Sequence, residues 1–306
     1  RRSSDLTPPL FADDAPGFIQ STIEGFQQSD FEFQRSISNV PFPPIAFVSG
    51  SSYSEVEFET PEGTKGQYDL DRVSAMGAVP FLLGKRDALF AGAYLSRSDF
   101  SVSGTEQDDF EVNSVGIPFG WIRQQNPDWQ YAAFVMPMGH DSNQPGSDWS
   151  WQFMGGAFAR YVQTDNLWWA FGLYADIQEN DEFYIPYVGA SWSINERWTL
   201  SAVMPWPAVI YSPSPNWMFR LGAAPSGASW SIEEEGGDTA VNLDSWDFGL
   251  SAQYRIYSNL WIGARAGIGG LRGLRLEDDS IEEPDLDLDS NAFFGLELNF
   301  RPAVQL

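Results

Sequence analysis

Apolar and polar residues alternate one by one along most of the chain from about residue 45 onward, in segments separated by polar turns. The alternation is clearest over 246–257, where one parity holds Trp246, Phe248, Leu250, Ala252, Tyr254 and Ile256, and the other holds Asp247, Gly249, Ser251, Gln253 and Arg255. A helix would instead repeat its apolar residues at i, i+3 and i+4, so a period of two predicts β-strands.

The same pattern predicts strands along the rest of the chain. Their ranges are 45–60, 67–82, 88–103, 109–123, 128–140, 148–163, 166–178, 183–195, 197–210, 246–257, 260–269 and 292–300. In the segment 197–210 the alternation places Trp198, Leu200, Ala208 and Ile210 on one apolar face.

One further segment, 216–233, does not keep a single parity. Its apolar residues occupy odd-numbered positions up to Ala223 and even-numbered positions from Ala228, and the change falls across Pro225, Ser226 and Gly227. Such a change marks either a β-bulge in one strand or a tight turn between two strands. We predict the turn and about fourteen strands, or twelve if an end segment lies outside, because single-chain bacterial barrels have even strand numbers.

The connections between the predicted strands alternate in length. Short connections lie at 84–87, 125–127, 164–166, 195–197 and 258–259, and longer ones at 61–66, 104–109, 141–148, 178–182, 234–240 and 277–290. Outer-membrane barrels have short turns at one end and long loops at the other. We therefore predict an all-β chain with an irregular N-terminal extension over 1–40 and a closed antiparallel transmembrane β-barrel over 41–306.

Composition narrows the function classes. The chain has 17 Lys and Arg against 42 Asp and Glu, a net charge of −25, which excludes nucleic acid as a partner because phosphates need a basic surface. It has no cysteine, so disulfides, thiolate metal sites and a thiol nucleophile are excluded. No apolar run reaches the roughly 18 residues of a membrane-spanning helix, and mean hydropathy is −0.27. A barrel keeps such a low mean because only alternate residues are apolar.

Tryptophan supports a membrane barrel over a soluble sandwich. Many of the tryptophans fall at the ends of predicted strands, where an interfacial aromatic girdle places them. They are Trp121, Trp129, Trp149, Trp168, Trp192, Trp198, Trp217, Trp246 and Trp261. A soluble secreted all-β binding protein, with tryptophans that stack on sugars, is the alternative.

The acidic residues concentrate in the predicted long loops. The loop after 277 is the most acidic, with Asp278, Asp279, Glu282, Glu283, Asp285, Asp287 and Asp289. We interpret these charges as a solvated rim; the alternative is a divalent-cation site, since carboxylate oxygens suit Ca²⁺. The loop lacks the glycine and spacing of an EF-hand. No metal site is firmly predicted, and no other cofactor is expected.

Several charged residues fall on the polar parity, which faces the lumen. The predicted lumen and selectivity residues are Arg72, Arg160, Arg220, Arg255, Arg265, Arg301, Glu297 and Asp247. Rings of arginine favour anions in pores. The alternative is that these charges pair with one another and fill the barrel.

The single histidine, His140, lies at the end of a predicted strand beside Asp141 and Ser142. We interpret it as a polar residue at a loop edge. A hydrolytic base is the alternative, but no G-x-S-x-G motif positions a serine nucleophile. No enzymatic activity is expected.

Short motifs in the second half of the chain carry a family resemblance. They are 185–192 (IPYVGASW), 195–200 (NERWTL), 204–207 (MPWP), 227–230 (GASW) and 294–300 (FGLELNF). Over 183–301 the chain resembles a family of uncharacterised outer-membrane β-barrel proteins of planctomycete-type bacteria. The resemblance implies an outer-membrane barrel and no assigned activity. The residues after Phe300 depart from the terminal aromatic on which many outer-membrane proteins end.

The leading hypothesis is an integral barrel of the outer membrane of a Gram-negative-type bacterium. It acts as a porin-like diffusion channel for small polar or anionic solutes. The alternative is a non-conducting structural or interaction barrel that uses its acidic surface loops. The partners implied are the lipid bilayer, outer-membrane lipids, small solutes and further copies of the chain in a homo-oligomer or array.

Overall fold

The computed structural model describes residues 17–29, 37–59, 65–104, 108–144, 147, 149–178, 182–204, 206–234, 237–269, 274–277 and 291–302. Within them lie one helix, α1 (Phe18–Gln27), and sixteen strand segments in one sheet. The first eight strands are β1 (Ala46–Glu59), β2 (Lys65–Leu83), β3 (Asp87–Ser103), β4 (Phe110–Gly116), β5 (Phe119–Gln124), β6 (Trp129–Ser142), β7 (Ser150–Thr164) and β8 (Leu167–Gln178). The other eight are β9 (Glu182–Ser193), β10 (Trp198–Val203), β11 (Ala208–Ser214), β12 (Trp217–Glu234), β13 (Gly237–Tyr257), β14 (Leu260–Gly269), β15 (Leu274–Glu277) and β16 (Asn291–Phe300).

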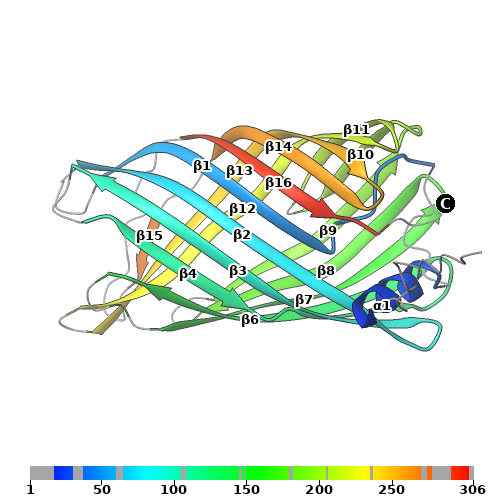
Figure 1. The fold of residues 1–306 in the computed structure, drawn as a ribbon, viewed down its shortest axis with the longest axis horizontal. Helices are drawn as coiled ribbons and strands as arrows, with labels where there is room; N and C mark the ends of the chain where they lie inside the picture. The colour runs from blue at the N-terminus through cyan, green and yellow to red at the C-terminus, as the bar shows by residue number, and fades with distance from the viewer. Residues whose placement is uncertain are drawn as a thin grey trace, which may run out of the picture.

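The strands form a closed antiparallel barrel (Figure 1). Apart from β5 and β15, each strand pairs with the next along the chain, and β1 pairs with β16 from Ala46↔Phe300 to Tyr53↔Phe293, which closes the ring. β4 and β5 both lie between β3 and β6, so they form one interrupted strand, and β15 continues the line of β14 along β13. The barrel therefore has fourteen strands, as the sequence predicts.

The outer surface of the barrel is apolar and the inner surface is largely polar. Leu250, Ile262 and Leu296, all on the predicted apolar parity, are 53%, 48% and 54% exposed. On the opposite parity Gln253 and Asn299 are buried. A water-soluble protein would bury the apolar face, so this is a transmembrane barrel and not a soluble sandwich. Among the described residues, no helix is long and apolar enough to cross a membrane.

The predicted turn at 225–227 is wrong. β12 runs through these residues, and its ladder with β13 continues unbroken from Trp217↔Tyr254 to Glu234↔Gly237. The additional strand comes from 197–210, which divides into β10 and β11. The chain reverses there, and Leu200 pairs with Val209. A proline on each side of Trp206 supplies the break, because proline donates no hydrogen bond to a ladder.

The reversal also changes which side chains face inward. Trp198 and Leu200 point outward, as predicted, but Ala208 is buried and Ile210 lines an internal cavity. The outward residues of β11 are Val209 and Tyr211, the partners of Leu200 and Trp198. Ala208 and Ile210 are thus on the opposite face from the one that a continuous strand predicts.

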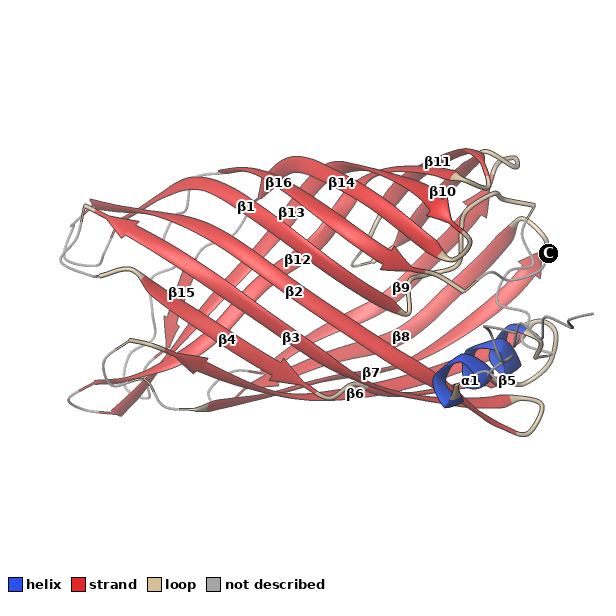
Figure 2. Cartoon of the chain, viewed as in Figure 1, coloured by secondary structure: helices blue, strands red, loops and turns tan. Residues whose placement is uncertain are grey.

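Helix α1 and residues 37–45 occupy the short-turn end of the barrel, where the strand order also brings the end of β16 (Figure 2). The helix lies within the part predicted to be irregular. Its one buried side chain, Phe26, packs edge-on against Phe90 of β3, with 5.5 Å between ring centroids. Phe26 also contacts Phe42 of the following segment at 6.5 Å. Phe26 is thus the buried anchor of the helix, and the exposed Phe18 adds a ring contact with Phe81 of β2 at 6.2 Å between centroids.

Candidate functional site

The barrel interior is the candidate site, because it brings together all eight predicted lumen residues. Seven lie on the inward parity of their strands: Arg72 on β2, Arg160 on β7, Arg220 on β12, Asp247 and Arg255 on β13, Arg265 on β14 and Glu297 on β16. The eighth, Arg301, follows β16 directly and is buried. They do not form one ring but belong to separate clusters.

The first cluster lies at the short-turn end and is centred on Arg301. Its Nη2 donates to Oε1 of Gln253 over 2.6 Å, and Gln253 in turn donates to Glu297. Its guanidinium lies 5.6 Å from the ring centroid of Trp261. Burial lowers the pKa of Arg301 to about 10, and the charge of Glu297 opposes this shift. The guanidinium is therefore positive at neutral pH.

Arg160 forms a second cluster on β7, six strands round the barrel from β16. Its Nη1 donates to Oε1 of Gln130 over 2.9 Å, and the guanidinium stacks 5.0 Å from the ring centroid of Trp168. Trp168 and Trp261 both lie inside the barrel under an arginine. They therefore do not belong to the outer aromatic girdle in which the sequence analysis placed them.

A third group lies deeper, on β1, β2, β13 and β14. Arg72 donates to the hydroxyl of Ser98 over 2.9 Å. The Tyr53 hydroxyl donates to Oδ2 of Asp247 over 2.8 Å. Arg265 lies 5.7 Å from the ring centroid of Phe293. These inward arginines thus contact neutral hydrogen-bond acceptors and aromatic rings.

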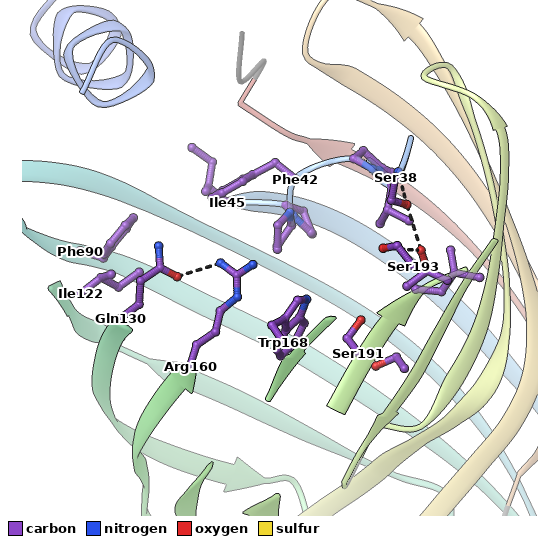
Figure 3. A pocket seen from close by; sticks show the side chains of 17 residues that line it. Ser38, Phe42, Ile45, Phe90, Ile122, Gln130, Arg160, Trp168, Ser191 and Ser193 are labelled. Carbon is purple, nitrogen blue, oxygen red and sulfur yellow. Dashed lines mark hydrogen bonds between the residues drawn. The ribbon is translucent and has the colours of Figure 1, made fainter. Parts of the chain in front are cut away.

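Segment 38–45 crosses the short-turn opening and encloses a cavity of about 480 Å³ beneath it (Figure 3). Ser38 bonds to the hydroxyl of Thr199 on β10 at 2.9 Å, and the Asn39 side chain donates to the carbonyl of Ser212 on β11. Phe42 faces Phe90 and Ile122 on the other side. These anchors lie on well-separated parts of the ring, so the segment spans the opening.

The cavity has one apolar and one polar side. Phe42, Ile45, Phe90 and Ile122 line the first, and Arg160 with a row of hydroxyl groups lines the second. The hydroxyl groups belong to Ser38, Ser191, Ser193, Thr199 and Ser201. A space of this size and mixed lining suits a small solute that carries both polar and apolar groups.

His140 does not lie at a loop edge, as predicted, but is buried in a side-chain network on four neighbouring strands. Its Nδ1 lies 2.8 Å from the hydroxyl of Ser114, and its Nε2 lies 2.8 Å from Oε1 of Gln152. Gln152 donates through Nε2 to Oδ1 of Asp176 over 2.7 Å. The carboxylate therefore fixes the amide, the amide oxygen accepts from Nε2, and Nδ1 accepts from Ser114. Asp141 and Ser142, the partners considered from the sequence, play no part in it.

The long-loop half of the lumen contains a second feature that parity alone missed, an apolar cluster. Its buried members are Tyr53, Leu70, Phe100, Phe110, Val112 and Phe293, from β1, β2, β3, β4 and β16. All lie on the parity expected to be polar. The sequence contains one signal for this cluster: large residues occupy alternate positions of this parity on each side of a loop, Phe100 with Val102 before it and Phe110 with Val112 after it.

The acidic loop after Glu277 lies outside the described residues, so Asp278, Asp279, Glu282, Glu283, Asp285, Asp287 and Asp289 stay a prediction. Within the described part of the chain, no group of three or more His, Asp or Glu side chains is placed to hold a metal ion.

Comparisons with known proteins match one family and several solved barrels. The model of the family described as Domain of unknown function (DUF6268) matches residues 84–301. No curated protein matches the sequence. Among solved structures, the COG4313 outer membrane channel from Pseudomonas putida F1 is 12% identical with a TM-score of 0.48, covering 84% of this chain and 96% of that one. A Pseudomonas aeruginosa FadL homologue is 12% identical with a TM-score of 0.46, covering 84% of this chain and 89% of that one. The translocator domain of the autotransporter NalP from Neisseria meningitidis is 9% identical with a TM-score of 0.41, covering 92% of this chain and 93% of that one.

Proposed function

We infer a function for this chain, which belongs to the DUF6268 family, from its own barrel: it is a diffusion channel of an outer membrane. It passes small polar or anionic solutes and catalyses no reaction. The observation that carries the proposal is that, among the residues whose side chains the structure describes, six arginines face inward against three inward acids, Asp176, Asp247 and Glu297. Inward arginines lower the energy of an anion in the lumen, and a fourteen-strand barrel is wider than the eight-strand barrels whose interiors are filled by side chains.

Outward aromatic residues near the short turns support the membrane placement. The ring centroids of Trp198 and Tyr211 lie 4.5 Å apart, and those of Trp217 and Tyr254 lie 4.6 Å apart. Aromatic rings of this kind gather at the level of the lipid headgroups. We propose the outer membrane of a Gram-negative-type bacterium, with its lipids as the barrel's surroundings.

The test is conductance of the detergent-purified chain in a planar bilayer, with the reversal potential measured in a salt gradient. Discrete steps with anion preference are expected. The double variant Arg255→Gln, Arg265→Gln is expected to move the reversal potential toward that of an unselective pore. The matched control is Arg97→Gln, because Arg97 lies on the outer surface, paired with Asp99 and Glu111. Equal selectivity in all three proteins would refute the assignment of selectivity to the lumen arginines.

A non-conducting interaction barrel is the second candidate, and the segment across the short-turn opening favours it. In that case the barrel inserts stably without conductance, and the acidic loops bind surface material or further copies of the chain through Ca²⁺. Neutralising Asp285, Asp287 and Asp289 to Asn would then abolish Ca²⁺-dependent association. Association that is unchanged by these substitutions or by chelation would refute this role.

A further inference from the structure

The wall of the barrel is interrupted on its long-loop side between β9 and β12. The ladder between β9 and β10 ends at Gly189↔Val203, and the ladder between β11 and β12 ends at Ala208↔Gly222. One backbone bond follows on each side, from Met204 to Val188 and from Ala223 to the Pro207 carbonyl. Beyond these bonds, the described parts of β9 and β12 continue toward the long loops with no strand paired between them.

The interruption lies at the depth of the hydrocarbon. β10 has 6 residues and β11 has 7, whereas β9 has 12 and β12 has 18. Six tilted residues rise about 15 Å, which is less than the roughly 25 Å of the apolar band of a membrane barrel. Val188 and Tyr184, above the end of β10, are exposed outward on β9. β9 and β12 extend beyond the point where β10 and β11 stop (Figure 1), and the exposed side chains of β9 continue its apolar outer surface there.

Both edges of this interruption contain a proline, which reduces the cost of unpaired backbone groups in lipid. Unpaired N–H groups are costly in hydrocarbon, and proline has none. Pro186 lies in the unpaired part of β9, and Pro225 lies in β12 just beyond its last partner on β11. Arg220 of β12 joins this strand to the bend between β10 and β11, at the short-turn side of the interruption. Its Nη2 donates to the carbonyl of Ala223 over 3.0 Å and to that of Trp206 over 3.5 Å.

A line of inward aromatic rings leads from the lumen to this interruption. Phe134 of β6 stacks on Phe158 of β7, with 5.9 Å between ring centroids. Phe158 in turn meets the ring of Tyr187 on β9 edge-on, with 4.6 Å between centroids. Tyr187 in turn lies 5.8 Å from Trp206, which is in the bend between β10 and β11. The rings form a continuous surface on which a flat apolar molecule stacks in successive positions.

We propose that the interruption between β9 and β12 is a lateral opening that passes small aromatic, apolar solutes between the lumen and the membrane along Phe134, Phe158, Tyr187 and Trp206. The inference rests on the proposed channel function, and it adds a second route for a second solute class. Charged solutes stay on the axial route past the arginines. Aromatic solutes leave sideways, because the hydrocarbon is a better solvent for them than water.

The test uses uptake of N-phenyl-1-naphthylamine by Gram-negative cells that carry the full chain. This dye fluoresces on entering lipid, so the initial rate reports entry past the outer surface. Cells with the native chain are expected to take up the dye several-fold faster than cells without it. Tyr187→Asp and Trp206→Asp place a charge at the opening, and each is expected to return the rate to that of cells without the chain. Tyr187→Phe keeps the ring and is expected to keep the native rate.

Two controls keep the result decisive. Trp151→Ala removes an aromatic residue from the outer wall of β7, away from the opening, and is expected to leave uptake unchanged. Folding of each variant is checked by its heat-modifiable gel band, and Tyr187→Asn with Trp206→Gln replaces any aspartate variant that does not fold. Native uptake in the Asp variants, or no gain from the native chain, overturns the lateral opening. Dye uptake that depends on Tyr187 without any ion conductance would instead refute the axial channel alone.

Discussion

Arg301 is hydrogen-bonded to the N-terminal segment, since its Nη1 donates to the carbonyl of Phe42 over 2.7 Å. The residue that follows the last strand thereby holds the segment that precedes the first strand. Because the arginine is buried and positive at neutral pH, the bond is charge-assisted, and such bonds contribute about 1.5–3 kcal/mol.

Arg301→Ala is expected to loosen residues 38–45 and to raise conductance. The loss of about 1.5–3 kcal/mol corresponds to a tenfold or greater rise in local opening. Hydrogen exchange of the Asn39 amide, which donates to the Glu196 carbonyl over 2.7 Å, measures this opening. The control is Arg197→Ala, an exposed side chain at a short turn. If exchange and conductance both stay native in Arg301→Ala, the bond does not hold the segment.

Phe26→Ala is expected to release α1 from the barrel. Phe26 is 4% exposed and supplies the buried contact of a ten-residue helix. Removing a buried phenylalanine costs about 3 kcal/mol or more, and so short a helix is marginal on its own. Amide exchange across 18–27 should therefore approach that of an unfolded peptide. Ile19→Ala, which truncates a residue 58% exposed, should change it little; equal effects of the two substitutions would contradict the docking role of Phe26.

Gly189→Ala is expected to destabilise the pairing of β9 with β10. A Cβ atom at Gly189 would lie 2.0 Å from the backbone oxygen of Ala202, which is held in the ladder. Overpacking against backbone costs about 1–3 kcal/mol. The temperature at which the folded gel band disappears should fall. Gly50→Ala is the matched control, because nothing lies within 4 Å of its Cβ position. A fall of the same size in Gly50→Ala would refute this explanation.

Gln152→Leu is expected to destabilise the barrel by about 1–3 kcal/mol, because it leaves His140 and Asp176 without their shared partner. Denaturant-induced loss of tryptophan fluorescence measures the change. The control is Gln163→Leu, near the exposed end of the same strand, which removes only the exposed acceptor of the Trp169 indole N–H. Wild-type stability in Gln152→Leu would show that the network contributes nothing measurable.

The sequence predicts the strands well because the two sides of this sheet face opposite solvents. Lipid on one side and a polar interior on the other impose a period of two on each strand, and the pattern is visible without tertiary information. It fails at Met204–Trp206, where a reversal within one long segment keeps the strand number at fourteen but inverts Ala208 and Ile210. A parity change, as at Pro225, is not by itself a turn.

The site is harder to predict than the strands. The inward parity of Arg72 or Arg265 follows from local alternation, but their partners do not. Arg301 and Phe42 are separated by 259 residues, and Ser114 and His140 by 26. Such pairs are set by strand register and barrel closure, which a single sequence does not encode locally.

The pairing of β1 with β16 has a consequence for how the protein is made. The ring has two open edges until both strands are present, and each edge offers unpaired backbone groups to any other strand nearby. Its final ladder joins residues from opposite ends of the chain, which is the slowest kind of contact to form. Assembly therefore passes through an unclosed intermediate, and any truncation that removes β16 should yield aggregates in place of a smaller barrel.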